Sequence, residues 1–223
     1  MRNLLFLLIS VAAYAHASPP ARFEIDYEMT RNGTPLADIV HRFEHANGSY
    51  QIVETWKGRG LYALYGKIKR SSQGSVTDGG LKPLEYSDER TGRDTERAKF
   101  DWAAKTVTVQ FKGDPKTMPL PPHPHDRLAF FYEFAFNPPR SKEIALDVID
   151  GRGVSDQVYQ VENGERLATP AGEFDTIKLV RRKGDERAEL YLAKDRYLLP
   201  IRLLIVRQDG TRLDQVVKRI SGV

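Results

Sequence analysis

The feature that most constrains this chain is a period-two alternation of apolar and polar residues that recurs between tight-turn dipeptides. Residues 23–30 read FEIDYEMT, with an apolar side chain at every second position. An extended segment of this kind has one apolar and one polar face and forms a half-buried strand. Asn32-Gly33 and Asn47-Gly48 separate it from the next two segments, and Asn-Gly is typical of two-residue hairpins. The sequence therefore predicts an N-terminal antiparallel meander.

Similar strand patterns, spaced by turn residues, continue to the C-terminus. Strands are expected over residues 37–46, 50–56, 61–70, 83–90, 96–102, 106–111, 144–149, 157–162, 174–182, 188–193, 201–206 and 211–220. Between them, the Ser- and Gly-rich residues 71–80 predict a mobile tip, and the Pro-rich residues 112–124 predict a loop. Asn163-Gly164 predicts a further turn.

One helix is predicted, starting near Asp126 and ending before Pro138. Aspartate can cap a helix by accepting backbone N–H bonds, and a residue that precedes proline disfavours the helical conformation. Residues 128–136 are apolar on nearly every side, which indicates a helix that is buried on most of its surface. The predicted fold is mainly β, with a single antiparallel curved sheet or open barrel of roughly a dozen strands and one buried helix.

The first seventeen residues have the three parts of a signal peptide. Arg2 is followed by an apolar run over residues 4–13 and by the small-x-small sequence Ala15-His16-Ala17. We expect a cleavable signal peptide over 1–17, a short linker over 18–22 and a single β domain over 23–223, located in the periplasm or secreted. An N-terminal membrane anchor is the alternative, disfavoured because the run is short. The mature part is expected to have no transmembrane span.

Composition and motifs exclude several classes of function. The 34 basic and 30 acidic residues give a net charge of +4, without the dense basic face of a nucleic-acid-binding protein. The chain has no cysteine, which excludes disulfides, cysteine nucleophiles and acylation of a lipoprotein cysteine. Gly-x-Ser-x-Gly, His-Glu-x-x-His and a Gly-rich phosphate loop are absent. The sequence therefore favours a non-enzymatic protein without a cofactor, while paired carboxylates leave a hydrolase open.

The segment His123-Pro124-His125-Asp126 is the one cluster with metal-ligand residue types. The intervening proline keeps the chain extended, and no second His-rich segment completes a site. His41 and His45 share a strand face but lie about 13 Å apart, too far to share one ion. We therefore expect no metal, and we interpret His123, His125 and Asp126 as a polar loop that leads into the helix cap.

Several ordered segments resemble a known family. They are Phe23-Glu24-Ile25-Asp26-Tyr27 with Asn32-Gly33; Gly79-Gly80-Leu81-Lys82-Pro83-Leu84-Glu85-Tyr86; Phe100-Asp101-Trp102; Asp126-Arg127-Leu128-Ala129-Phe130-Phe131-Tyr132; Thr169-Pro170-Ala171-Gly172-Glu173-Phe174; and Tyr197-Leu198-Leu199-Pro200-Ile201-Arg202. Together they resemble the uncharacterised exported bacterial family known as domain of unknown function 3108. The resemblance implies an exported β protein. A more distant likeness, to the half-barrels of periplasmic lipoprotein carriers, implies an apolar cavity around a helical plug.

Aromatic residues are the candidates for lining such a cavity. They are Tyr27, Trp56, Tyr62, Trp102, Phe130, Phe131 and Phe134. Apolar linings are typical of ligand sites, but ordinary core packing explains the same residues and is favoured.

Three functions follow, in order of preference. The first is a periplasmic protein that binds or carries a lipid or another apolar envelope ligand, and a filled interior would count against it. The second is a structural or interaction module of the cell envelope with an envelope protein partner. It predicts a packed core and an exposed apolar patch. The third is a hydrolase of envelope polymers.

Overall fold

The computed structural model describes residues 19–223, so the expected signal peptide over 1–17 lies outside the described residues. In the N-terminal half the strands are β1 (Arg22–Arg31), β2 (Thr34–Ala46), β3 (Ser49–Gly58), β4 (Lys67–Thr77), β5 (Gly80–Arg90), β6 (Glu96–Asp101), β7 (Thr106–Gln110) and β8 (Lys116–Pro119). A short 3-10 helix, η1 (Gly60–Tyr65), connects β3 to β4.

The rest of the chain contributes seven strands and one α-helix. They are β9 (Pro124–Asp126), α1 (Ala129–Phe136), β10 (Glu143–Asp150), β11 (Gly153–Thr169), β12 (Gly172–Lys183), β13 (Glu186–Ala193), β14 (Leu199–Val206) and β15 (Arg212–Ser221). All fifteen strands form one sheet in the order β8-β7-β6-β5-β4-β3-β2-β1-β15-β14-β13-β12-β11-β10-β9. The only parallel pair among residues 19–223 is β9 with β10. This confirms the predicted curved, open antiparallel sheet, with more strands than expected.

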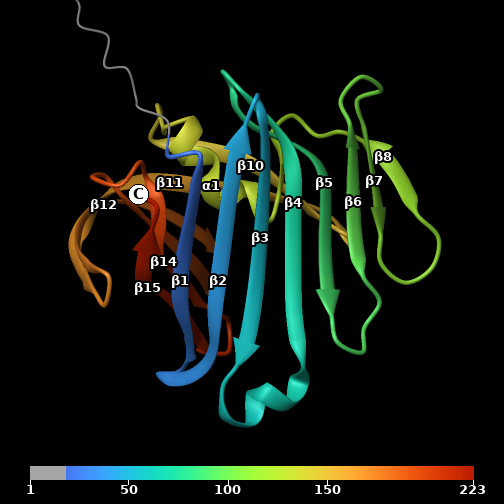
Figure 1. Cartoon of the computed structure of the whole chain (residues 1–223). Coiled ribbons are helices and arrows are strands. Elements are labelled where there is room, and N and C mark those ends of the chain that lie inside the picture. Colours follow the sequence, from blue (N-terminus) through green and yellow to red (C-terminus); the bar gives the residue numbers. More distant parts are fainter. Residues whose placement is uncertain (1–18) are drawn as a thin grey trace, which may run out of the picture.

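The sheet curls around α1, which lies on its concave side (Figure 1). The helix contacts β5, β9 and β14, three strands that are far apart in the order of the sheet. Six of its eight residues are buried, which confirms the prediction of one buried helix. No helix within residues 19–223 is long and apolar enough to cross a membrane.

A glycine closes the curl where the turn after β10 meets β6 and β7. A Cβ atom on Gly151 would lie 2.5 Å from the Glu96 Cβ and 2.7 Å from the Gln110 carbonyl oxygen, so only glycine allows this approach. Beside it, Arg152 forms an ion pair with Glu96 at 2.8 Å. Gly151 and Arg152 therefore connect the two arms of the sheet, the one that contains β6 and β7 and the one that contains β10. No strand ladder joins these two arms within residues 19–223.

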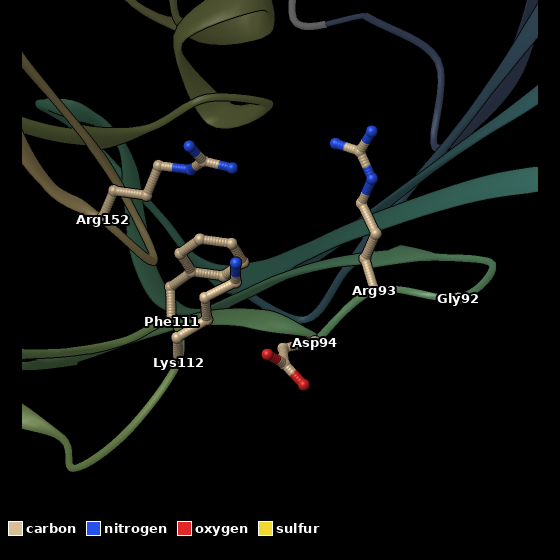
Figure 2. Close-up of a pocket in the computed structure, with 6 residues that line it drawn as sticks. All are labelled: Gly92, Arg93, Asp94, Phe111, Lys112 and Arg152. Atoms are coloured by element: carbon tan, nitrogen blue, oxygen red, sulfur yellow. The ribbon is translucent and has the colours of Figure 1, made fainter.

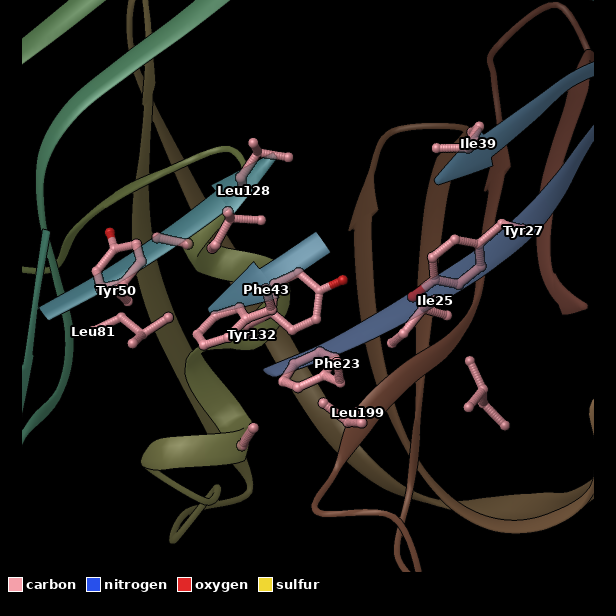
Figure 3. Close-up of a cluster of buried hydrophobic side chains, with 14 of the residues drawn as sticks. Phe23, Ile25, Tyr27, Ile39, Phe43, Tyr50, Leu81, Leu128, Tyr132 and Leu199 are labelled. Carbon is pink, nitrogen blue, oxygen red and sulfur yellow. The ribbon is translucent and has the colours of Figure 1, made fainter. Parts of the chain in front are cut away.

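The core has two clusters of buried residues, one on each side of α1. In the larger cluster Phe23 stacks on Phe43 with 4.9 Å between ring centroids, and Phe43 lies 5.2 Å from the ring of Tyr132 of the helix (Figure 3). In the smaller cluster Phe130 and Phe134 pack among leucines of β12 and β13. Adjacent helical residues thus face different walls, which explains why the helix is apolar on most sides.

The N-terminal hairpins form as predicted. Asn32 and Gly33 have φ of 49° and 80°, and Asn47 and Gly48 have φ of 51° and 74°. Two successive positive φ values are the signature of the turns that match the twist of a hairpin.

The prediction of a strand from residue 61 was wrong. Residues 60–65 form η1 instead, and β4 begins only at Lys67. Gly60 and Gly66 both have positive φ, so the backbone turns at each end of η1. The predicted mobile tip at 71–80 is also wrong in its first part, since β4 continues to Thr77. Gly74 lies there because Lys82 and Tyr50 pack closely against it, not because the segment is a loop.

Two other predictions need correction. Asn163-Gly164 is no turn, because β11 runs through it with a register shift between Asn163 and Arg166. Gly164 allows close contact with Thr176 of the neighbouring strand. Within the predicted loop 112–124, residues 116–119 form the strand β8. It pairs with the backbone N–H and C=O groups of β7, which would otherwise be the edge of the sheet.

Candidate functional site

A row of four buried ionisable residues crosses the concave face of the sheet. His41, Glu54, Arg70 and Asp88 come from β2, β3, β4 and β5, and each is the direct cross-strand partner of the next. Residues opposite one another in a ladder point to the same face, so the register alone brings these side chains into contact. His41 Nε2 donates to Glu54 Oε2 at 2.8 Å. Arg70 donates to Glu54 Oε1 and, at 2.7 Å, to Asp88 Oδ2.

The two end residues of the row, His41 and Asp88, each have a further hydrogen-bond partner. At one end the Tyr132 hydroxyl of α1 lies 2.8 Å from His41 Nδ1. At the other end Arg90 donates to the two oxygens of Asp88 at 2.9 and 2.6 Å. Every charged group of the row therefore has a partner of opposite charge or a hydrogen-bond partner, as buried polar groups require.

The electrostatics of the row suit a structural role better than acid-base chemistry. Burial acts to raise the pKa of Glu54, but Arg70 and His41 outweigh it and lower that pKa to about 2. Burial likewise acts on Asp88, where the hydrogen bond from Arg90 and the charge of Arg70 hold the pKa below its ordinary value. A general base works best with a pKa near the operating pH, and these carboxylates lie far below it.

A second group of polar side chains lies in a cleft between α1 and the strands β5, β9 and β10. His125 Nε2 is 3.2 Å from Glu133 Oε2, and His125 Nδ1 is 3.2 Å from the His123 carbonyl oxygen. Both partners are acceptors, so the doubly protonated imidazolium satisfies both. Burial acts to lower the pKa of His125, but the hydrogen bond and charge of Glu133 outweigh it and raise that pKa above its ordinary value.

The cleft has a volume of about 540 Å³, and its walls combine polar groups with apolar ones such as Leu81, Ile144 and Leu146. Glu133 also accepts hydrogen bonds from the Leu81 backbone N–H at 2.8 Å and from Asn137 Nδ2 at 3.0 Å. Trp102 lines the cleft, with the Lys82 ammonium 4.5 Å from its ring centroid. The carboxylate is thus saturated by its neighbours.

The expected helix cap is confirmed by the bonds of Asp126. Its Oδ1 accepts from the backbone N–H groups of Leu128 and Ala129, both at 2.8 Å, and Ser72 donates to Oδ2 at 2.5 Å. Burial raises the pKa of Asp126 to about 6. In the same segment the Asp147 carboxylate accepts from the His123 backbone N–H.

The three weak metal candidates therefore have separate partners. The Asp126 carboxylate faces Ser72 and the first turn of α1, the His125 ring lies against Glu133, and the backbone of His123 is tied to Asp147. Within residues 19–223 no group of three His, Asp or Glu side chains is placed to hold a metal ion.

The aromatic candidates do not gather around one cavity. Tyr27 is buried and its hydroxyl donates to the Pro200 carbonyl oxygen at 2.7 Å. Phe130 and Phe134 belong to the smaller core cluster, and the half-buried Phe131 packs against both clusters. Trp102 lies at the His125 cleft, whereas Trp56 and Tyr62 line a different hollow at the opposite end of the strands.

That second hollow lies beside η1, at the end of the sheet where β3 turns into β4 (Figure 1). It measures about 180 Å³ and has apolar walls that include Leu36 and Ile68. Next to it Leu61 and Leu64 are 80% and 84% exposed, the two most exposed large apolar side chains among the described residues. We call η1 with these two leucines the apolar tip.

The apolar tip is held on the sheet by polar and close contacts. Arg59, just before η1, donates to both oxygens of Asp38 at 2.7 and 2.6 Å and to Glu28 at 2.6 Å. Gly58 has no side chain because the Tyr62 backbone packs directly against its Cα. These contacts keep the leucines exposed on a defined backbone.

Two exposed lysines flank the apolar tip. Lys57 at the end of β3 and Lys67 at the start of β4 are direct cross-strand partners. Like charges placed opposite one another destabilise a sheet. Neither lysine forms an ion pair within residues 19–223, and Asp38, the other cross-strand neighbour of Lys57, is already bound by Arg59 and Lys218.

A basic hollow lies at the turn between β5 and β6 (Figure 2). It measures about 630 Å³ and is lined by Gly92, Arg93, Asp94, Phe111, Lys112 and Arg152. The Arg152 guanidinium lies 4.3 Å from the centroid of the Phe111 ring. Hydrogen bonds link the residues next to this hollow and next to the apolar tip: the Thr91 backbone N–H donates to the Lys67 carbonyl at 3.1 Å, and Thr91 Oγ1 accepts from the Lys67 N–H at 2.9 Å.

Sequence reasoning missed both the buried row and the apolar tip. The spacing along the strand relates His41 to His45, whereas the partner of His41 is Glu54 on the neighbouring strand. The apolar tip was predicted as part of a strand, although Gly58, Gly60 and Gly66 bracket the segment and were a signal for a turn.

Comparison with known proteins places the chain in a family. Among solved structures it is similar to an inferred exported protein with a YmcC-like fold from Bacteroides fragilis, at 11% identity and a TM-score of 0.39, covering 92% of this chain and 97% of that one. It is also similar to an inferred lipoprotein from Parabacteroides distasonis, at 9% identity and a TM-score of 0.36, covering 91% of this chain and 97% of that one. No curated protein matches. Residues 22–216 match the family described as protein of unknown function DUF3108, and the chain therefore belongs to the DUF3108 family.

Proposed function

We propose that this protein is a non-enzymatic docking module of the cell envelope, which attaches to another envelope component through the apolar tip. The exposure of Leu61 and Leu64 on an otherwise well-packed sheet carries the proposal. Location in the periplasm, or secretion, is part of it and rests on the signal-peptide pattern of residues 1–17.

The packed interior favours docking over carriage of a ligand inside the sheet. The concave face is filled by α1 and by the larger core cluster, which includes Tyr27 among its buried aromatic residues. The apolar hollow beside η1, at about 180 Å³, is smaller than the roughly 300–1,000 Å³ of typical ligand pockets. The hollow of about 630 Å³ has mainly charged walls. The cleft of about 540 Å³ has mixed walls, in which charged groups such as Glu133 alternate with apolar ones such as Trp102 and Leu146.

The state of the buried ionisable groups favours a non-enzymatic role over a hydrolase. A hydrolase needs a carboxylate or imidazole that can exchange a proton with substrate. Glu54 and Asp88 are neutralised by arginines on neighbouring strands, and His125 and Glu133 bind each other. These partners would have to be displaced before any of the four could reach a substrate.

Cell fractionation with substitutions at the apolar tip tests the proposal. We expect the wild-type protein, expressed with its own leader in its native host, to sediment with envelope membranes. The L61S/L64S variant is expected to move to the soluble fraction. The matched control is L84S/V158S, which removes two other exposed apolar side chains outside η1. Identical distribution of L61S/L64S and wild type, at equal thermal stability, would refute docking through the apolar tip.

A further inference from the structure

We infer that the component bound by the apolar tip is the surface of an anionic lipid bilayer, with Leu61 and Leu64 inserted among the lipids and Lys57 and Lys67 at the headgroups. The inference rests on the proposed docking function and names its partner. Three observations carry it: the direction of the leucines, the contacts that hold η1 on the sheet and the charge around them.

The two leucines point the same way. Leu61 and Leu64 are three residues apart in a 3-10 helix, where residues i and i+3 lie one above the other. Both are more than three-quarters exposed, and Ala63 between them is exposed as well. The result is a small exposed apolar surface on η1, which lies at the end of the sheet (Figure 1). Apolar side chains presented in this way bind a lipid interface through the area that they bury there.

The apolar tip is held against the sheet by specific contacts. The fork of Arg59 binds Asp38 and Glu28, which belong to two neighbouring strands, and the backbone of Tyr62 packs onto Gly58. Neither leucine lines the apolar hollow beside η1, and both are exposed instead. An apolar surface held in this way loses little conformational entropy when it inserts.

The surrounding charge matches an anionic surface. Lys57 and Lys67 repel each other across the ladder and have no acidic partner of their own, so an anionic headgroup relieves a cost that the free protein bears. Arg93 and Lys112 in the basic hollow add further positive charge. Lys69 is excluded from this set because Glu89 lies opposite it, and Asp94 is the one acidic residue that lines the basic hollow.

Vesicle flotation tests the inference. The probes are vesicles of phosphatidylglycerol and phosphatidylethanolamine in equal amounts, and vesicles of phosphatidylcholine alone. We expect the exported protein to float with the anionic vesicles and only weakly with the neutral ones. L61S/L64S should weaken binding by about a hundredfold, since each leucine loses its burial in lipid. K57Q/K67Q should weaken it by about twentyfold and reduce its dependence on salt. L84S/V158S should bind as wild type does.

The outcomes separate this inference from the proposed docking function. If wild type floats with neither vesicle while its envelope fractionation still requires Leu61 and Leu64, the lipid partner is wrong and docking to a protein stands. If the variants of the apolar tip float as wild type does, lipid insertion through this tip is wrong. If fractionation is also unchanged in L61S/L64S, both proposals fail. Thermal unfolding of each variant establishes that a loss of binding is not a loss of fold.

Discussion

Glu54 lies directly opposite His41 in the ladder between β2 and β3, and the two buried side chains meet at 2.8 Å. Arg70 lies opposite Glu54 on its other side, so a single carboxylate bridges an imidazole and a guanidinium inside the sheet. Buried ion pairs add little net stability compared with apolar packing, because desolvation offsets the attraction. Their contribution here is to specify register, since a slip of one residue would move one charge to the other face of the sheet and leave its former partner buried and unpaired.

The first prediction concerns Glu54→Gln. Losing this carboxylate leaves the buried Arg70 with half of its acidic partners, and breaking a buried pair costs about 3–5 kcal/mol. We expect a loss of that order in the free energy of unfolding, measured by urea denaturation. Glu44→Gln is the control, because its pair with Arg22 is exposed, and such pairs contribute about 0–1 kcal/mol. Equal effects of the two substitutions would contradict the role of the row.

The second prediction is that the protein loses stability at acidic pH because Glu54 and Asp88 become protonated. The pKa of Glu54 is lowered to about 2, and that of Asp88 is lowered too, so their contribution is complete above their ordinary pKa values near 4. It is lost as the pH falls through the folded-state values. We expect unfolding free energy to decline between about pH 4.5 and 2, and Glu54→Gln to flatten the lower part of this decline. A decline of equal steepness in the variant would contradict the assignment.

The third prediction is a weakening on the alkaline side. The pKa of His125 is raised above 6.5 by its contact with Glu133. The stability from this pair is therefore complete below about pH 6.5 and decreases as the pH rises through the folded-state pKa. His125→Gln should remove this dependence, as followed by urea denaturation over the neutral and mildly alkaline range. The two N–H groups of Gln share one nitrogen, which can replace only one of the two ring nitrogens that bind Glu133 and the His123 carbonyl, so the variant is also expected to be less stable at low pH.

The fourth prediction tests how the sheet is closed. A Cβ at position 151 would collide with the Glu96 side chain and with backbone atoms of β6 and β7, which cannot move away. Gly151→Ala is expected to destabilise the protein by about 1–3 kcal/mol, the usual cost of overpacking. Gly79→Ala is the control, since the nearest atom to a Cβ there lies at 3.8 Å and its φ is unstrained. A tolerated Gly151→Ala would mean that the two arms of the sheet do not meet as described.

The fifth prediction concerns metal ions. Asp126, His125 and Glu133 have protein partners, and a metal would have to break those bonds. Zinc added to the chelator-treated protein is therefore expected to leave its melting temperature unchanged. A zinc-dependent rise that disappears in His125→Gln would indicate a metal site in the cleft and overturn the interpretation of this segment as a structural one.

The sequence alone predicted the elements whose conformation depends on residues close together in the chain. The alternation over residues 23–30 needs only the geometry of one strand, and Asn32-Gly33 needs only the φ values of two residues. The helix followed from Asp126, whose side chain binds the N–H groups two and three residues later, and from the prolines that end the segment. These features depend on neighbours along the chain and could be predicted from it.

The tertiary structure alone decided the rest, because it depends on neighbours across the sheet. Nothing in the chain near His41 identifies Glu54 as its partner, and Arg70 and Asp88 join them only through the registers of three ladders. The apolar run at residues 61–64 suits a buried strand as well as an exposed turn, and packing of the Tyr62 backbone on Gly58 selected the turn. Periodicity thus determined that this chain forms strands around one helix. Strand register determined which charges are buried together, and packing of η1 on β3 determined that Leu61 and Leu64 are exposed.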